Sequence, residues 1–288
     1  MGSALFIVWR ESIEAILVVG ILYAWIRERG EGRIAMRDLW AGVALGVALA
    51  LLLALGILGV QTQLAGTALD VFQVTVVFAA AALIVQMVFW MRRNARGLKR
   101  ELEEGMQQAV RSRSRYAAAL LAAAAVAREG SETVLFLYGL AMEHQGLEFG
   151  AMLGGACAGF VLALGTAWLI GKLSRLVSWK SFFQVTEVLL LLLGAALVAG
   201  GVDKLIALGW LPALADNLWD TTPLLDDASP TGSLVAGFTG YRAQPCLSFA
   251  LAYGAYWLVV WLLSRASGIE TGRPTKSTPA PASSTGQV

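Results

Sequence analysis

Two short stretches combine one arginine with two glutamates at the same spacing, and each lies inside an apolar run. The first reads Arg-Glu-x-x-Glu over residues 10–14, and the second repeats the pattern over residues 128–132. Glutamates three positions apart lie on one face of a helix, one turn apart. Each stretch therefore presents two carboxylates along one edge of its helix. The pairs are Glu11 with Glu14 and Glu129 with Glu132.

Charges of this kind are costly in a helix that crosses a membrane. Each charged side chain costs about 2.5–3.5 kcal/mol at the helix centre, so six cost roughly 15–20 kcal/mol before pairing. In a purely structural explanation, Arg10 and Arg128 each pair with the glutamate four positions later and lock a helix bundle. That explanation leaves Glu11 and Glu129 without partners, and two arginines against four glutamates leave a formal charge of −2. We favour the alternative, a path for cations through the bundle.

The donor atoms of this group are all carboxylate oxygens. Oxygen ligands favour hard metal ions, whereas soft ions prefer Cys, Met or His. Glutamates that project from several helices hold iron in ferritin-like proteins, but the same ligands also suit calcium or manganese. The residues predict a hard cation and leave its identity open.

The composition indicates which elements position these residues. The chain has 288 residues, of which 57% are hydrophobic and 15% charged, and its mean hydropathy is +0.66. Soluble domains are about 45–50% apolar and about 25% charged, and apolar runs of about 20 residues suffice to span a membrane as helices. We expect an all-α integral membrane protein with seven transmembrane helices, at about 4–26, 38–60, 68–91, 116–142, 150–173, 182–208 and 247–264.

A second pair of matched segments indicates an internal duplication. Phe-Gln-Val-Thr opens both the third and the sixth expected helix, at residues 72–75 and 183–186. The second and fifth helices are both rich in Gly and Ala, which permits close packing. Three helices form an odd number, so the second copy must cross in the opposite sense. The sequence therefore predicts a 3+3 inverted repeat plus one extra C-terminal helix, as in many secondary transporters, with both motifs near the midplane.

The basic residues set the expected orientation. Most of the 22 Lys and Arg residues follow the first helix, lie between the third and fourth or the fifth and sixth, or follow the last. The positive-inside rule then places the N-terminus outside and the C-terminus inside the cytoplasmic (inner) membrane. The expected organisation is a permease domain over 1–267, with repeat one over about 1–91, a cytoplasmic loop over 92–115, repeat two over about 116–208, an external loop over 209–246 and a disordered cytoplasmic tail over 268–288.

Other polar residues within the expected helices are secondary candidates. Glu187 is ionisable, and we expect it to face the path. Four uncharged residues either line the path or make hydrogen bonds between helices: Gln73, Thr75, Gln184 and Thr186. Near the outer end of the sixth helix, Lys204 can extend to the interface, where Asp203 can pair with it.

The external loop carries a further group of acidic residues. Asp220, Asp226 and Asp227 are either a solvated loop or a cluster that raises the local concentration of cations above the path. The basic charge of 92–115 is read as an orientation signal and a contact with lipid headgroups, and no nucleic-acid partner is expected.

The doubled motif, in a seven-helix chain with an outside N-terminus, resembles the oxidase-dependent iron permease family. That family includes fungal high-affinity ferric permeases, the membrane component of the bacterial Efe system and related lead permeases. The resemblance covers about residues 1–265, including the external segment 218–245. The family's commonest motif reads Arg-Glu-Gly-Leu-Glu, whereas the middle pairs here are Ser12-Ile13 and Gly130-Ser131. Fungal members follow Asp-Ala-Ser in the loop with a glutamate, where this chain has Pro230.

The resemblance implies uptake of ferric iron, Fe³⁺, with Glu11, Glu14, Glu129 and Glu132 as its ligands and an external oxidase or iron-delivery protein as partner. We expect no permanently bound cofactor. The sequence has no HExxH motif, no GxSxG motif and no paired aspartates within the helices. Their absence argues against an intramembrane hydrolase. The alternatives are a permease for divalent cations or lead on the same scaffold, and a membrane metal sensor.

Overall fold

The computed structural model describes residues 2–28, 33–94, 117–143, 149–173, 179–215 and 217–270. Within these ranges the regular elements are helices, without strands, so the predicted all-α class is confirmed. Seven helices are long and one is short: α1 (Gly2–Glu28), α2 (Arg33–Gln63), α3 (Thr67–Asn94), α5 (Ala117–Glu143), α6 (Phe149–Leu173), α7 (Trp179–Ala207), α8 (Pro230–Thr239) and α9 (Leu247–Glu270).

Five of the long helices, α2, α3, α6, α7 and α9, are long and apolar enough to cross a membrane. The helices α1 and α5 have similar length, 27 residues each, but carry the three motif charges in their interiors. The side chains of Leu52 and Leu55 on α2 are 63% and 65% exposed, an apolar surface that suits contact with lipid. Seven as the number of spans stays a prediction.

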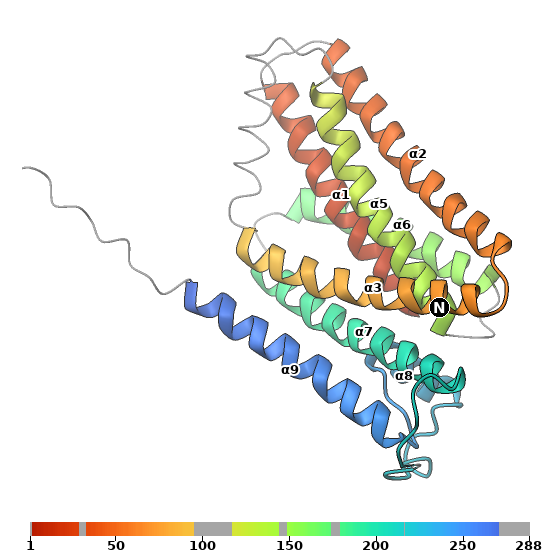
Figure 1. Ribbon diagram of the computed structural model, residues 1–288. Coiled ribbons are helices and arrows are strands. Elements are labelled where there is room, and N and C mark those ends of the chain that lie inside the picture. Colours follow the sequence, from red (N-terminus) through yellow and green to blue (C-terminus); the bar gives the residue numbers. More distant parts are fainter. Residues whose placement is uncertain are drawn as a thin grey trace, which may run out of the picture.

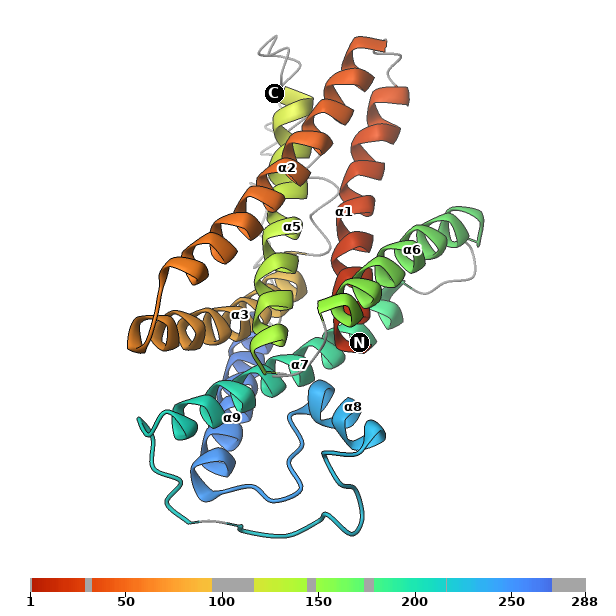
Figure 2. The same cartoon turned by 90° about the vertical axis from the view of Figure 1, so that its right-hand side faces the viewer.

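The two motif helices form the centre of the molecule. They lie side by side and run in opposite directions, with α2 along α5 and α6 along α1 (Figures 1 and 2). Glycines allow α2 to approach α5 closely and α6 to approach α1 closely. A Cβ atom at Gly46 of α2 would lie 3.0 Å from the backbone nitrogen of Ala127, and one at Gly159 of α6 would lie 3.1 Å from that of Trp9. The glycine-rich second and fifth helices thus pack closely, as their composition predicts.

The helices α3 and α7 form a second antiparallel pair, which packs against α5 and α9 (Figure 1). Two polar contacts join the ends of this pair. Lys204 donates a hydrogen bond to Gln73 at one end, and Arg92 forms an ion pair with Glu187 at the other. Between them most side chains are apolar, with Thr75 and Gln86 of α3 as exceptions. Tyr256 of α9 donates to the carbonyl oxygen of Leu191 at 2.7 Å.

Two apolar clusters flank the charged stretch of α1. Phe6 and Ile7 belong to a cluster with buried side chains of α3, α5, α7 and α9. One or more turns further on, Val18 and Leu22 pack with Leu39 of α2 and other residues. The motif of α1 therefore lies between two apolar clusters along the helix.

The external segment contains a helix, α8, that we did not expect within the loop 209–246. Ser229 caps it by accepting a hydrogen bond from the backbone N–H of Gly232, and Gly240 ends it at φ 72°, a conformation that favours glycine. The segment lies on the rest of the fold, because Ser3 of α1 donates to the carbonyl oxygen of Gly237 at 3.2 Å.

One expected boundary needs correction, because residues 268–270 belong to α9 rather than to a disordered tail. Residues 92–94 extend α3 into the segment 92–115. The remainder of both segments, 95–115 and 271–288, lies outside the described residues.

Candidate metal site

Three carboxylates from the two motif helices converge. Glu11 and Glu14 of α1 and Glu129 of α5 each offer an oxygen, and these atoms all lie within 4.8 Å of one another. The spacing of three residues places Glu11 and Glu14 one turn apart on the face of α1 that meets α5. The side chains of Glu11 and Glu129 are buried, at 1% and 7% exposed, so the cluster lies inside the protein.

Arg10 is buried beside this cluster and holds both glutamates of its own helix. Its Nη1 donates to Glu11 Oε1 at 2.7 Å, and its second terminal nitrogen forms an ion pair with Glu14. The expectation that Arg10 pairs with Glu14 is confirmed. The expectation that Glu11 lacks a partner is wrong, because a guanidinium group presents several donors in a fork and can serve two carboxylates at once.

Arg128 is arranged differently on α5. Its Nε donates to Glu132 Oε1 at 3.1 Å, which confirms the predicted pair, and lies 3.9 Å from Glu129 Oε1. Glu132 is buried at 8% exposed but lies outside the group of three converging carboxylates. The cluster consequently has three close members, and the fourth predicted ligand is held by its own arginine.

Both arginines are supported by α3, which the sequence analysis did not anticipate. Arg10 donates to the sulfur atoms of Met87 and Met91, at 3.1 and 3.5 Å. The guanidinium of Arg128 lies over the ring of Trp90, 4.3 Å from its centroid, in the geometry of a cation–π contact. The spacing of Met87 and Met91 places both on one helical face, and this was the sequence feature that could have indicated the contact. Methionines are common in apolar cores, however, and their partners lie far away in sequence.

Several carboxylate oxygens of the motifs lack hydrogen-bond partners among the described residues. They are buried, and they belong to all four motif glutamates: Glu11, Glu14, Glu129 and Glu132; the oxygen of Glu14 is the one in the ion pair with Arg10. A buried carboxylate oxygen without a partner is unfavourable, and binding a cation or a proton relieves that cost. Clustered carboxylates and the absence of softer donors in the group suit a hard metal ion.

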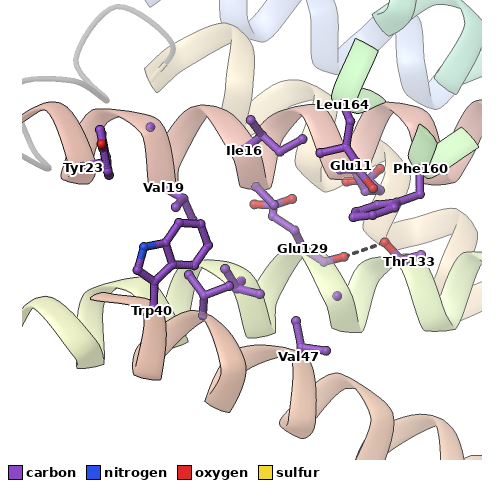
Figure 3. Close-up of a pocket in the computed structure, with 16 residues that line it drawn as sticks. Glu11, Ile16, Val19, Tyr23, Trp40, Val47, Glu129, Thr133, Phe160 and Leu164 are labelled. Carbon is purple, nitrogen blue, oxygen red and sulfur yellow. Dashed lines mark hydrogen bonds between the residues drawn. The ribbon is translucent and has the colours of Figure 1, made fainter. Parts of the chain in front are cut away.

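A cavity of about 500 Å³ adjoins the cluster. Figure 3 shows Glu11 and Glu129 at its wall, between α1 and α5, with Val47 of α2 and Phe160 of α6 at its sides. Thr133 Oγ1 donates to the backbone carbonyl oxygen of Glu129 at 2.8 Å. Most of the remaining wall is apolar.

The secondary candidates within the helices lie away from the carboxylate cluster. Glu187 pairs with Arg92 and Gln73 with Lys204, at the two ends of the α3–α7 pair. Thr75 donates to the carbonyl oxygen of Val71 on its own helix. Gln184 is exposed and Thr186 is buried. The expected pairing of Asp203 with Lys204 is wrong, because Arg242 of the external segment donates to Asp203 at 2.8 Å.

The external aspartates accept hydrogen bonds within their own segment. Asp220 accepts from the backbone N–H of Thr222 at 2.9 Å and from Gln244 at 3.1 Å. Asp226 accepts from Ala228 N–H at 2.9 Å, and Asp227 from Ala243 N–H at 3.4 Å. Among the residues that the structure describes, these carboxylates do not converge on a common point, so a role in capture stays a prediction.

The chain resembles a family of transport proteins and several curated relatives. The iron permease FTR1 family matches residues 1–274. A protein named ferrous iron permease EfeU from Yersinia pestis is 30% identical over 263 residues, covering 89% of this chain and 90% of the relative. Its namesake from Escherichia coli O6:K15:H31 is 30% identical over 277 residues, covering 93% of this chain and 97% of the relative. No solved structure matches the chain.

Proposed function

The chain belongs to the iron permease FTR1 family, and from this premise we propose that it imports iron through the carboxylate cluster of α1 and α5. It is an iron transport protein that crosses the membrane several times. The observation that carries the proposed site is the convergence of Glu11, Glu14 and Glu129 within 4.8 Å in the interior. The cluster is the transient resting place of the cargo, and Glu132 is the fourth carboxylate, released from Arg128 when iron passes.

We propose ferric iron as the cargo. Three carboxylates with unsatisfied oxygens form a hard, strongly negative site, and the affinity of such sites rises with the charge of a hard cation. The ferric form would be supplied by an oxidase or delivery protein at the outer face. A second candidate is ferrous iron, because the relatives carry the name ferrous iron permease. A divalent cation or lead is a third outcome of the test below.

An inverted repeat is part of this proposal, and one pair of helix contacts together with the spacing of the motifs supports it. Gly46 of α2 approaches Ala127, and Gly159 of α6 approaches Trp9. Ala127 comes 118 residues after Trp9 in the sequence. Arg128 follows Arg10 by the same 118 residues. The outer helix of each half thus packs near the residue that precedes the motif on the helix of the other half, although the nearest atoms differ: Val126 Cβ for Gly46 and the carbonyl oxygen of Leu5 for Gly159.

The same symmetry suggests where the path opens and closes. The two Phe-Gln-Val-Thr segments lie at opposite ends of the antiparallel α3–α7 pair, where Gln73 contacts Lys204 and Glu187 contacts Arg92. We propose that these two contacts break in turn as the cluster is exposed to the outside and then to the cytoplasm. With the N-terminus outside, the Gln73 contact lies towards the outer face, because α3 begins on that side.

Uptake into proteoliposomes tests the site and the cargo together. Wild-type protein is supplied with ⁵⁵Fe as ferric citrate, with ⁵⁵Fe kept ferrous by ascorbate, or with manganese or lead at a fixed pH gradient. Glu11→Gln and Glu129→Gln should each abolish uptake while leaving the amount of folded protein unchanged. Glu28→Gln serves as the matched control, since it neutralises an exposed carboxylate of α1 outside the cluster. Wild-type uptake by both motif variants would refute the site, and preferred uptake of the ascorbate-reduced metal would refute the ferric cargo.

A further inference from the structure

The cavity beside the cluster has walls that are poorly suited to a metal ion. Apart from the two carboxylates and the hydroxyl groups of Ser12, Thr133 and Tyr23, it is lined by apolar and aromatic side chains that continue for several turns of α1 (Figure 3). The opposite wall includes Trp40 and Val47 of α2. A metal ion gains little from most of this wall, because oxygen ligands are few along it.

The end of the cavity has the opposite character. Glu11 and Glu129 are buried there, and each keeps one oxygen that lacks a hydrogen-bond partner among the described residues. Counting both motifs, two arginines face four glutamates, a formal charge of −2. One compact chamber therefore joins unsatisfied negative charge to a long apolar wall.

We propose that this cavity binds a lipophilic primary ammonium ion. Glu11 and Glu129 turn their partnerless oxygens, which are covered in this structure, towards the cavity and accept hydrogen bonds from the –NH₃⁺ group of the ion. Its alkyl chain lies along the apolar wall towards Trp40. A primary ammonium carries three donors and one positive charge, which matches two carboxylates and partly neutralises them. A cavity of about 500 Å³ is within the range of roughly 300–1,000 Å³ that small-molecule sites occupy.

Access from the bilayer fits the exposure of the wall. Val47 and Phe160 line the cavity and are still 47% and 49% exposed. They lie on α2 and α6, whose other apolar side chains also face outward. A cation with an alkyl chain partitions into the bilayer and can enter sideways between these helices, whereas an inorganic cation cannot cross the hydrocarbon to do so.

The inference goes beyond iron transport, because it needs the carboxylates and the apolar wall and makes no use of the cargo. Its test is therefore a binding measurement without iron. Purified wild-type protein in lipid nanodiscs is titrated with tritiated n-octylamine, and empty nanodiscs give the partitioning background. We expect saturable binding of one molecule per chain that excess n-octanol fails to displace.

Two variants probe the two ends of the chamber. Val47→Phe fills the space that the alkyl chain would occupy, and Glu11→Gln removes one carboxylate. Each should weaken octylamine binding at least about ten-fold, because the first removes room for the alkyl chain and the second removes a charge-assisted hydrogen bond. Leu51→Phe is the matched control, because Leu51 lies one turn further along α2, is 60% exposed and does not line the cavity. It should bind like wild type.

Several results would overturn the proposal. They are the lack of saturable binding above empty nanodiscs, displacement by octanol as effective as by unlabelled octylamine, or equal affinity of Val47→Phe and wild type. If Val47→Phe does not yield folded protein, Ala15→Leu fills the same cavity from α1 and carries the same expectation. Failure of iron uptake in the same preparation would count against the proposed transport function and leave this test intact.

Discussion

The two motifs contain the same three charges at the same spacing, yet their surroundings differ sharply. Arg10 is 3% exposed, lies against Met87 and Met91 and holds two glutamates. The side chain of Arg128 is 41% exposed and donates to one glutamate at close range. The α1 motif therefore has a desolvated arginine held on several sides, whereas the α5 motif has an accessible arginine beside two buried glutamates.

The origin of this difference is α3, which belongs to the first half of the chain alone. It supplies thioether sulfurs to Arg10 but an aromatic ring to Arg128. Two motifs with the same charged residues thus have unequal surroundings because one helix, α3, contacts both arginines. Equal motifs need not have equal roles, and the comparison can be tested by changing one half at a time.

The largest effect is expected from removing the two arginines in turn. Arg10→Ala leaves Glu11 and Glu14 buried without their cation, and breaking a buried pair in this way costs about 3–5 kcal/mol. Arg128→Ala should cost about 1 kcal/mol or less, because a partly exposed ion pair is screened by solvent. Thermal unfolding midpoints of the two purified variants in detergent measure the difference. Equal losses would show that the two motifs are equivalent in stability.

Replacing single glutamates should separate the halves in iron binding. Glu11→Gln removes a member of the converging group, and we expect a loss of affinity of at least about 10–100-fold, the range seen even for partners of metal ligands. Glu132→Gln should lower affinity less, since that carboxylate is held by Arg128. Equilibrium binding of ⁵⁵Fe to detergent-purified protein compares the two affinity losses. A greater loss with Glu132→Gln would show that the α5 carboxylates contribute more to the site than those of α1.

A smaller effect should show that α3 supports each arginine separately. Trp90→Leu removes the contact with Arg128, which is worth about 0.5–2 kcal/mol. In a double-mutant cycle it should couple to Arg128→Ala by about that amount and add independently to Arg10→Ala. Free energies of unfolding for the four combinations give the coupling. Strong coupling of Trp90 to Arg10 would mean that α3 acts on both motifs as one unit.

The smallest effect lies outside both motifs and provides the baseline for the comparison. The pKa of Asp220 lies below its usual value because Thr222 and then Gln244 donate hydrogen bonds to its carboxylate. The stability that this group contributes is present above its unfolded-state pKa and is lost as the pH falls through the lower folded-state pKa. Thr222→Ala should raise that pKa, as measured by carbon-13 NMR of labelled aspartate, and leave iron uptake at neutral pH unchanged. Reduced uptake would favour a role of the external aspartates in capture.

The sequence predicted the motif helices and their local pairs well, because both depend on short spacings. The i,i+4 pairs of Arg10 with Glu14 and of Arg128 with Glu132 follow from one turn of helix and are found in the structure. Apolar runs of membrane length likewise located the long helices, since backbone groups in hydrocarbon require helical hydrogen bonding.

The contacts between distant helices could not be predicted from spacing. Nothing in the order of residues indicates that Met87 meets Arg10, or that Arg242 rather than Lys204 pairs with Asp203. Such contacts depend on how helices cross, which is decided by many small packing terms at once. The short helix α8 was missed for a related reason, since its ten residues lie in a polar loop and gain their place by docking on α1 and α7.

The packing of α1 against α6 also has a consequence in time. Neither motif helix is covered by the second helix of its own half, because α6 lies along α1 and α2 lies along α5. Synthesis proceeds at about 5–20 residues per second, so the 118 residues between Arg10 and Arg128 take roughly 6 to 24 s to make. During that interval the buried charges of α1 lack α5 and α6, and α3 is the helix already made whose side chains contact Arg10. Met87 and Met91 of α3 are thus the earliest partners that Arg10 can find beyond its own helix. The first half of the chain therefore supplies its own contacts for the buried charge that it must insert.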